Sequence, residues 1–193
     1  MRKWLQYGGI AAAVVLIAFG IGALVLSIQG KNTVTDSLSQ EHIVGTPDMT
    51  PSAIKDEGTK AGLNPHTVDY PSCTVANKPV DTASEARCFA EYMRIHALEA
   101  SGGLTYALMP RYATADGKGT NDATQALKDA NGQPVDNAAR NLWVTETALS
   151  TALNSSYLAD NLGNFGIVVG IALILAGIGF GILAWFGGLR QPT

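Results

Sequence analysis

Two long apolar blocks dominate the pattern of hydrophobic and polar positions along the chain. Residues 5–28 contain no charged residue, and neither do residues 161–189. Each block exceeds the roughly 20 apolar residues that a helix needs to cross about 30 Å of hydrocarbon. The pattern therefore predicts transmembrane helices at residues 7–28 and 161–189, with short segments, 1–6 and 190–193, at the two ends.

The segment between the blocks, residues 29–160, has helical patterns of its own. Residues 33–43 are expected to continue the first span as a helix. Thr50 followed by Pro51 is typical of an N-cap and a first helical position, and Gly62 is typical of a helix end. We therefore expect a short helix that runs from Pro51 to about residue 61.

A second helix is predicted by Thr82 and Glu85, which have the spacing of a capping box. It is expected to close at the glycine pair Gly102 and Gly103. Its apolar positions recur at helical spacing. They are Ala86, Phe89, Met93 and Ala97.

The last part of this segment is polar and rich in turn residues between 113 and 133, with a short helix expected at 122–129. Residues 104–108 are the one candidate strand. Asp136 is expected to cap a final helix that leads into the second span, with Gly163 and Asn164 as a possible bend. The predicted fold class is mainly α, with two antiparallel transmembrane helices and a helical extracytoplasmic domain inserted between them.

Charge sets the expected orientation of the chain. Three of the 13 basic residues, Arg2, Lys3 and Arg190, flank the two blocks, which leaves ten basic against 16 acidic residues between the blocks, a net charge of −6. Because basic residues next to spans stay on the cytoplasmic side, we expect both termini in the cytoplasm and residues 29–160 outside. A cleaved signal sequence is the alternative for the first block, but the block is longer than a signal core.

Two cysteines, Cys73 and Cys88, both lie in the segment expected outside the cytoplasm. That compartment permits disulfides, so a bridge between them is the expected pairing. The alternative is half of a metal site. A metal site would need further ligands, and His66 is the nearest histidine in the sequence.

The second span carries a narrow stripe of small residues along one helix face, with two GxxxG pairs. Its members are Gly163, Gly166, Gly170, Gly177, Gly181, Ala184 and Gly188. Such a stripe lets two helix backbones approach closely in lipid. The first span has a weaker counterpart in Gly9, Ala13, Gly20, Ala23 and Ser27. The stripe therefore predicts helix packing, either within the chain or with another protein.

Candidate chemistry is sparse in the sequence. The three histidines, His42, His66 and His96, are far apart and belong to no metal-binding signature, so we expect no metal site, no cofactor and no catalytic residue. A face for a small ligand is possible where Tyr92, His96 and Glu99 lie one helical turn apart. The acidic oxygens near residues 116–122 do not match a calcium loop.

Two segments, Met93–Gly103 (MRIHALEASGG) and Trp143–Thr151 (WVTETALST), lie between the predicted spans. In this layout they resemble a group of small actinobacterial two-span membrane proteins of unknown function that are often labelled aromatic ring-opening dioxygenases. The resemblance implies a multi-pass protein of a bacterial plasma membrane. The catalytic label would need two histidines and a carboxylate that converge on iron, and the separated histidines do not predict such a set.

The function expected from the sequence is therefore not enzymatic. We expect an assembly or accessory component of a membrane complex, which contacts the lipid bilayer and either a membrane-protein partner or a second copy of itself. The alternative is an extracytoplasmic sensor or small-ligand-binding module. The acidic charge of the external segment is a poor match for nucleic acid, so no nucleic-acid partner is expected.

Overall fold

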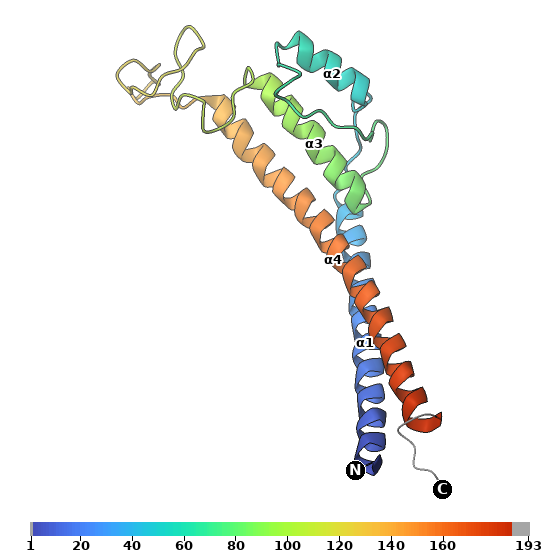
Figure 1. Ribbon diagram of the computed structural model, residues 1–193. Helices are drawn as coiled ribbons and strands as arrows, with labels where there is room; N and C mark the ends of the chain where they lie inside the picture. The colour runs from blue at the N-terminus through green and yellow to red at the C-terminus, as the bar shows by residue number, and fades with distance from the viewer. Residues whose placement is uncertain (1, 187–193) are drawn as a thin grey trace. The chain divides into compact units, whose positions relative to one another are not determined.

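The computed structural model describes residues 2–186, and this part of the chain is mainly helical (Figure 1). It contains four helices, α1 (Arg2–Gln40), α2 (Pro51–Lys60), α3 (Ala83–Ala100) and α4 (Ala138–Phe186). Only isolated β-bridges, and no strands, occur among the described residues. The chain divides into two compact units. Unit 1 combines Met1–Ser37 with Leu158–Thr193, and unit 2 is Leu38–Tyr157.

The two long helices, α1 and α4, are long and apolar enough to cross a membrane, by length and composition. Only 17% of the most apolar window of each is buried, whereas the core helix of a soluble protein is mostly buried. The predicted spans lie within these helices as far as residue 186. Residues 187–189 of the second predicted span and the C-terminal segment 190–193 lie outside the described residues.

In unit 1 the glycine stripe of α4 lies against α1. A β-carbon built on Gly170 would be 2.8 Å from the carbonyl oxygen of Gly20, and one built on Gly20 would be 2.7 Å from the carbonyl oxygen of Gly170. A β-carbon on Gly177 would lie 3.0 Å from the carbonyl oxygen of Ala13. Backbone oxygens cannot rotate away, so glycine is required for this approach.

The remaining stripe residues extend the same contact. A β-carbon on Gly166 would collide with Ser27 Oγ, and one on Gly181 would lie 3.7 Å from Ala13 Cβ. Ala184 is fully buried. Gly188 lies outside the described residues.

Lys31 makes a polar network in unit 1. Its Nζ donates to Asp160 Oδ1 at 2.6 Å and to Asn164 Oδ1 at 2.8 Å, and Asn164 Nδ2 donates to Asp160 Oδ2 at 3.1 Å. Gly163 leaves room for the lysine stem, because a β-carbon there would lie 2.7 Å from Lys31 Cγ. At Gly163 and Asn164, where a bend is expected, α4 continues as one helix.

The caps that define α2 and α3 in unit 2 confirm the local sequence signals. Thr50 accepts a hydrogen bond from Ala53 N, and Pro51 begins α2. Thr82 and Glu85 form the predicted capping box at the start of α3. Each cap satisfies backbone N–H groups that a helix start otherwise leaves without partners.

The core of unit 2 lies around α3. Its largest fully buried side chains are Tyr92, Ile54, Ile95, Val75 and Val80. Cys73 and Cys88 form a disulfide with Cα atoms 6.1 Å apart. Tyr92 Oη donates to the carbonyl oxygen of Cys73 at 2.7 Å, so the bridge and this hydrogen bond hold the segment between α2 and α3 on α3 at neighbouring points.

Three local expectations in unit 2 are wrong. Residues 122–129 form turns instead of a helix, because the Asp122 carboxylate accepts from the backbone and hydroxyl of Thr124 and offers the chain an alternative to helical bonds. Residues 104–108 form turns instead of a strand. The cap of α4 is Asn137, whose Oδ1 accepts from Ala139 N, while Asp136 pairs in a bridge with Tyr112.

Candidate metal centre

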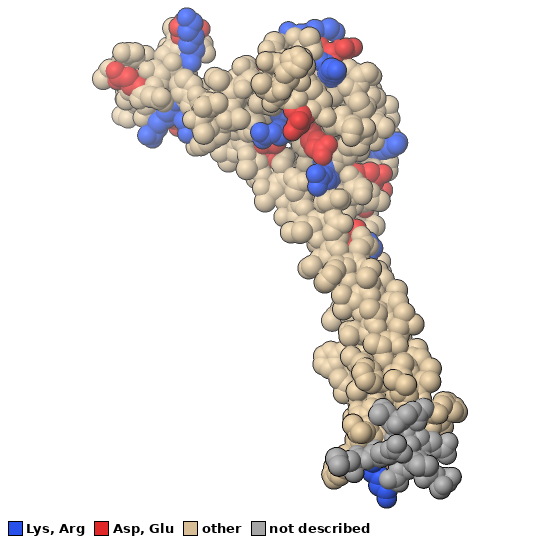
Figure 2. Space-filling view, viewed as in Figure 1, with Lys and Arg blue, Asp and Glu red and all other residues tan. Residues whose placement is uncertain are grey.

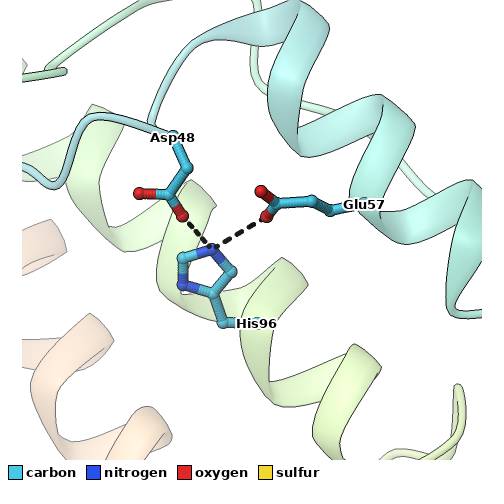
Figure 3. A group of neighbouring side chains, drawn as sticks. All are labelled: Asp48, Glu57 and His96. Atoms are coloured by element: carbon cyan, nitrogen blue, oxygen red, sulfur yellow. Dashed lines mark ion pairs between the residues drawn. The ribbon is translucent and has the colours of Figure 1, made fainter.

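Three side chains of metal-ligating type converge in unit 2, where α2 packs beside α3 (Figure 3). His96 Nε2 lies 3.4 Å from Asp48 Oδ2 and 4.0 Å from Glu57 Oε2. One ligand atom from each residue lies within 4.8 Å of the others. All three side chains are partly exposed, at 28% for His96, 32% for Asp48 and 40% for Glu57, so the cluster can be reached from solvent.

Local structure places each of these side chains. Asp48 lies in the turn before α2, where Met49 N donates to Thr46 O at 3.1 Å. Glu57 stands on α2, one turn beyond the fully buried Ile54 that anchors this helix to the core. His96 follows the buried Ile95 on α3. The carboxylates therefore come from one side of the α2–α3 pair and the imidazole from the other.

The cluster has an excess of acidic groups. Glu99 on α3 adds a third carboxylate within electrostatic range of Asp48 and Glu57. Burial raises the pKa of Glu99, the charge of His96 opposes this rise, and the charges of Glu57 and Asp48 add to it. The pKa of Asp48 is lowered, chiefly by a hydrogen bond from the Thr46 side chain, with a smaller contribution from His96. A cation would offset this negative charge.

Two buried oxygens beside the cluster have no hydrogen-bond partner among the described residues. They are Glu99 Oε1 and Tyr70 Oη. Burial, and then the charge of Glu99, raises the pKa of Tyr70. Gly58, which lies on α2, makes room for the Tyr70 hydroxyl, because a β-carbon on Gly58 would collide with that hydroxyl. Buried polar atoms without partners are uncommon, and they often mark the place of a water or an ion.

The donor set fits a divalent transition-metal ion. Imidazole nitrogen suits Zn²⁺ and its neighbours in the periodic table, whereas carboxylates alone suit Mg²⁺ and Ca²⁺. Zn²⁺ takes nitrogen and oxygen ligands at about 2.0–2.2 Å, so ligand atoms in a tetrahedral site lie about 3.3 Å apart. The distance from His96 Nε2 to Asp48 Oδ2, 3.4 Å, is close to this value. The distance from His96 Nε2 to Glu57 Oε2 is 4.0 Å, so the exposed Glu57 carboxylate has to move only a short way to match it.

The ligand face predicted from the sequence is divided in the structure. Tyr92 is fully buried and its hydroxyl donates a hydrogen bond to Cys73 O, so this side chain is part of the core and not of a ligand face. His96 and Glu99 do share one electrostatic environment. Sequence reasoning missed Asp48 and Glu57, and it predicted no metal site at all. Asp48 and Glu57 lie close to His96 only because α2 packs against α3, and this packing leaves no periodic signal in the sequence.

Other residues considered for ligand binding do not join this cluster. Among the described residues, the cluster contains one histidine, His96. A facial triad for iron requires two histidines and a carboxylate. In the region compared with a calcium loop, Asp116 accepts from Lys118 N and Asn121 accepts from Arg111 N. These oxygens stabilise separate turns.

Comparison with protein-family models, with curated proteins and with solved structures gave no match for this chain.

Proposed function

We propose that the protein is a membrane-anchored, extracytoplasmic metal-binding module. The observation that carries this proposal is the convergence of His96, Asp48 and Glu57, with ligand atoms within 4.8 Å of one another. The Glu99 carboxylate supports it, because it adds negative charge within electrostatic range of Asp48 and Glu57. The ion would be a divalent transition metal of the Zn²⁺ type, which mixed imidazole and carboxylate sites favour.

The anchor in this proposal is an antiparallel pair of spans formed by α1 and α4. Residues that follow one another outward along α1 meet residues in the reverse order along α4, as Ala13 meets Gly181, Gly20 meets Gly170 and Lys31 meets Gly163. Figure 2 supports a lipid environment, since charged side chains gather on unit 2 and the visible middle of unit 1 carries almost none. Aromatic residues at the ends of the described spans, among them Trp4 and Trp185, are exposed as in an interfacial belt.

The proposed orientation places both termini in the cytoplasm and unit 2 outside. The basic residues Arg2 and Lys3 support it, as does the disulfide, which is compatible with an oxidising compartment. A membrane-impermeant maleimide tests it in intact cells. After reduction with a permeant reagent and its removal, Cys73 and Cys88 should react from outside; labelling only after lysis would contradict the orientation.

A thermal-shift measurement on the full chain in mild detergent tests the binding function. Zn²⁺ should raise the melting temperature of the chelator-treated protein. Binding at a concentration 100-fold above the dissociation constant contributes about 2.7 kcal/mol of stability, and each kcal/mol corresponds to about 2–4 °C for a chain of this size. His96→Gln should abolish the rise. His66→Gln is the matched control, because His66 is exposed and outside the cluster, and it should leave the rise unchanged.

Assembly with a membrane partner stays a second proposal. Because the glycine stripe lies against α1, a partner would have to use another face of the spans. Phe165 and Val168 on α4 are exposed at 66% and 64% and belong to such a face. Photo-crosslinking from these two positions in native membranes should trap the partner; adducts with lipid alone would count against assembly.

A further inference from the structure

A second site candidate is a cavity of about 590 Å³ in unit 2. One wall is the irregular segment between residues 67 and 72, and another is the α3 face that carries Glu91, Arg94, Ile95 and Leu98. Gly103 and Thr105 close the end beyond α3. The volume lies within the range of roughly 300–1,000 Å³ that is usual for small-molecule sites.

Covalent and hydrogen-bonded restraints preform the irregular wall. At one end, Asn64 Oδ1 accepts from His66 N at 2.9 Å, and the Asn64 carbonyl accepts from Thr67 N at 3.0 Å. At the other end, the Cys73 disulfide and the hydrogen bond from Tyr92 fix the chain to α3. A preformed wall reduces the entropy cost of binding, which distinguishes this cavity from a gap beside a free loop.

Two opposite charges line the cavity without neutralising each other. Arg94 and Asp69 both border it, and no ion pair of either is found among the described residues. The Arg94 guanidinium lies 5.5 Å from the centroid of the Trp143 ring, which restrains it by a cation–π contact. By contrast, Glu91 is already paired, at 3.4 Å, with Arg87.

The lining also includes apolar side chains. Ile95 and Leu98 are 1% and 7% exposed, so they form a fixed floor with little accessible surface, whereas the half-buried Val68 on the irregular wall offers more. A guanidinium forms paired hydrogen bonds with a carboxylate, and an aspartate accepts hydrogen bonds from an ammonium. The lining therefore matches a molecule that carries both ionic groups and an apolar part.

We infer that this cavity binds a small zwitterion of the amino-acid class, with its carboxylate on Arg94, its ammonium on Asp69 and its side chain against Val68 and Leu98. Tyr70 borders both this cavity and the proposed metal centre, but none of the three proposed metal ligands, Asp48, Glu57 and His96, lines the cavity. Binding is therefore expected to persist when metals are removed.

Ligand-observed saturation-transfer NMR tests the inference on the full chain in detergent micelles with EDTA present. The probes are the standard L-amino acids, followed, for the strongest binder, by its analogues that lack the amino group or the carboxylate. Each analogue should bind at least about tenfold more weakly, because it leaves one charged partner without a counterpart. Equal binding of either analogue, or no binding by any amino acid, would overturn the inference.

Variants locate the binding in this cavity. Arg94→Gln and Asp69→Asn should each weaken the strongest binder by about tenfold or more. Arg111→Gln and Asp56→Asn are matched controls that make the same changes of charge in the same unit outside the cavity, and they should leave binding unchanged. Circular dichroism confirms that each variant is folded. Equal loss in controls and cavity variants would contradict the site.

Discussion

The close approach of α1 and α4 at Gly170 makes a prediction that can be worked out from the structure. In Gly170→Ala the added β-carbon would lie 2.8 Å from the Gly20 carbonyl oxygen and 2.8 Å from Leu24 Cγ. Leu24 can adopt another rotamer, but the backbone oxygen cannot move without shifting α1. Overpacking of this kind costs about 1–3 kcal/mol.

Alanine also favours the helix over glycine by up to about 1 kcal/mol, so one variant alone would mix two opposing effects. Gly179→Ala separates them. A β-carbon at Gly179 meets nothing within 4 Å, yet this residue lies on the same helix and gains the same propensity. The difference between the two variants therefore reports packing alone. We expect Gly170→Ala to be less stable than Gly179→Ala by about 1–3 kcal/mol.

Steric trapping in lipid bicelles, with one biotin tag on each span, measures this free energy of unfolding for the full chain. A second matched pair on α1 repeats the test. Gly20→Ala should behave like Gly170→Ala, because its β-carbon would lie 2.7 Å from Gly170 O, and Gly22→Ala should behave like Gly179→Ala. Equal stability within each pair would refute the close approach.

Two further predictions concern unit 2. Replacing Cys73 and Cys88 together by serine should lower the free energy of unfolding by about 3 kcal/mol, as expected for a loop of this length, in a chemical denaturation of the full chain; a loss near zero would mean that the bridge does not constrain the unfolded chain. The raised pKa of Glu99 means that the folded state binds the proton more tightly than the unfolded state, so stability without metal should fall as the pH rises above the usual glutamate value of 4.5. Thermal melts against pH should show this fall in the parent protein and a flatter profile in Glu99→Gln; identical profiles would contradict the assignment.

Local signals in the sequence were enough to predict much of the fold. Thr50 with Pro51, and Thr82 with Glu85, act within one helical turn, so their effect does not depend on the rest of the chain. The two long apolar helices follow from composition alone. The expected helix at 122–129 is wrong because a competing local interaction, the hydrogen bond from Thr124 N to the Asp122 side chain, stabilises a turn instead.

The candidate site was only partly predictable. His96 and Glu99 belong to one helix, so their spacing placed them on a common face. Asp48 and Glu57 reach His96 only because α2, held by the buried Ile54, packs beside α3. No motif joins a residue before one helix to a residue near the end of the next, and that contact can be found only in three dimensions.

Metal content of the purified full chain tests the central claim most directly. After incubation with Zn²⁺ and exhaustive dialysis, elemental analysis should find one zinc per chain in the parent protein and in His66→Gln, and little in His96→Gln or Glu57→Gln. X-ray absorption should show one imidazole nitrogen together with carboxylate oxygens at about 2.0–2.2 Å. Zinc that is not retained, or that is retained equally by His96→Gln, would contradict the account.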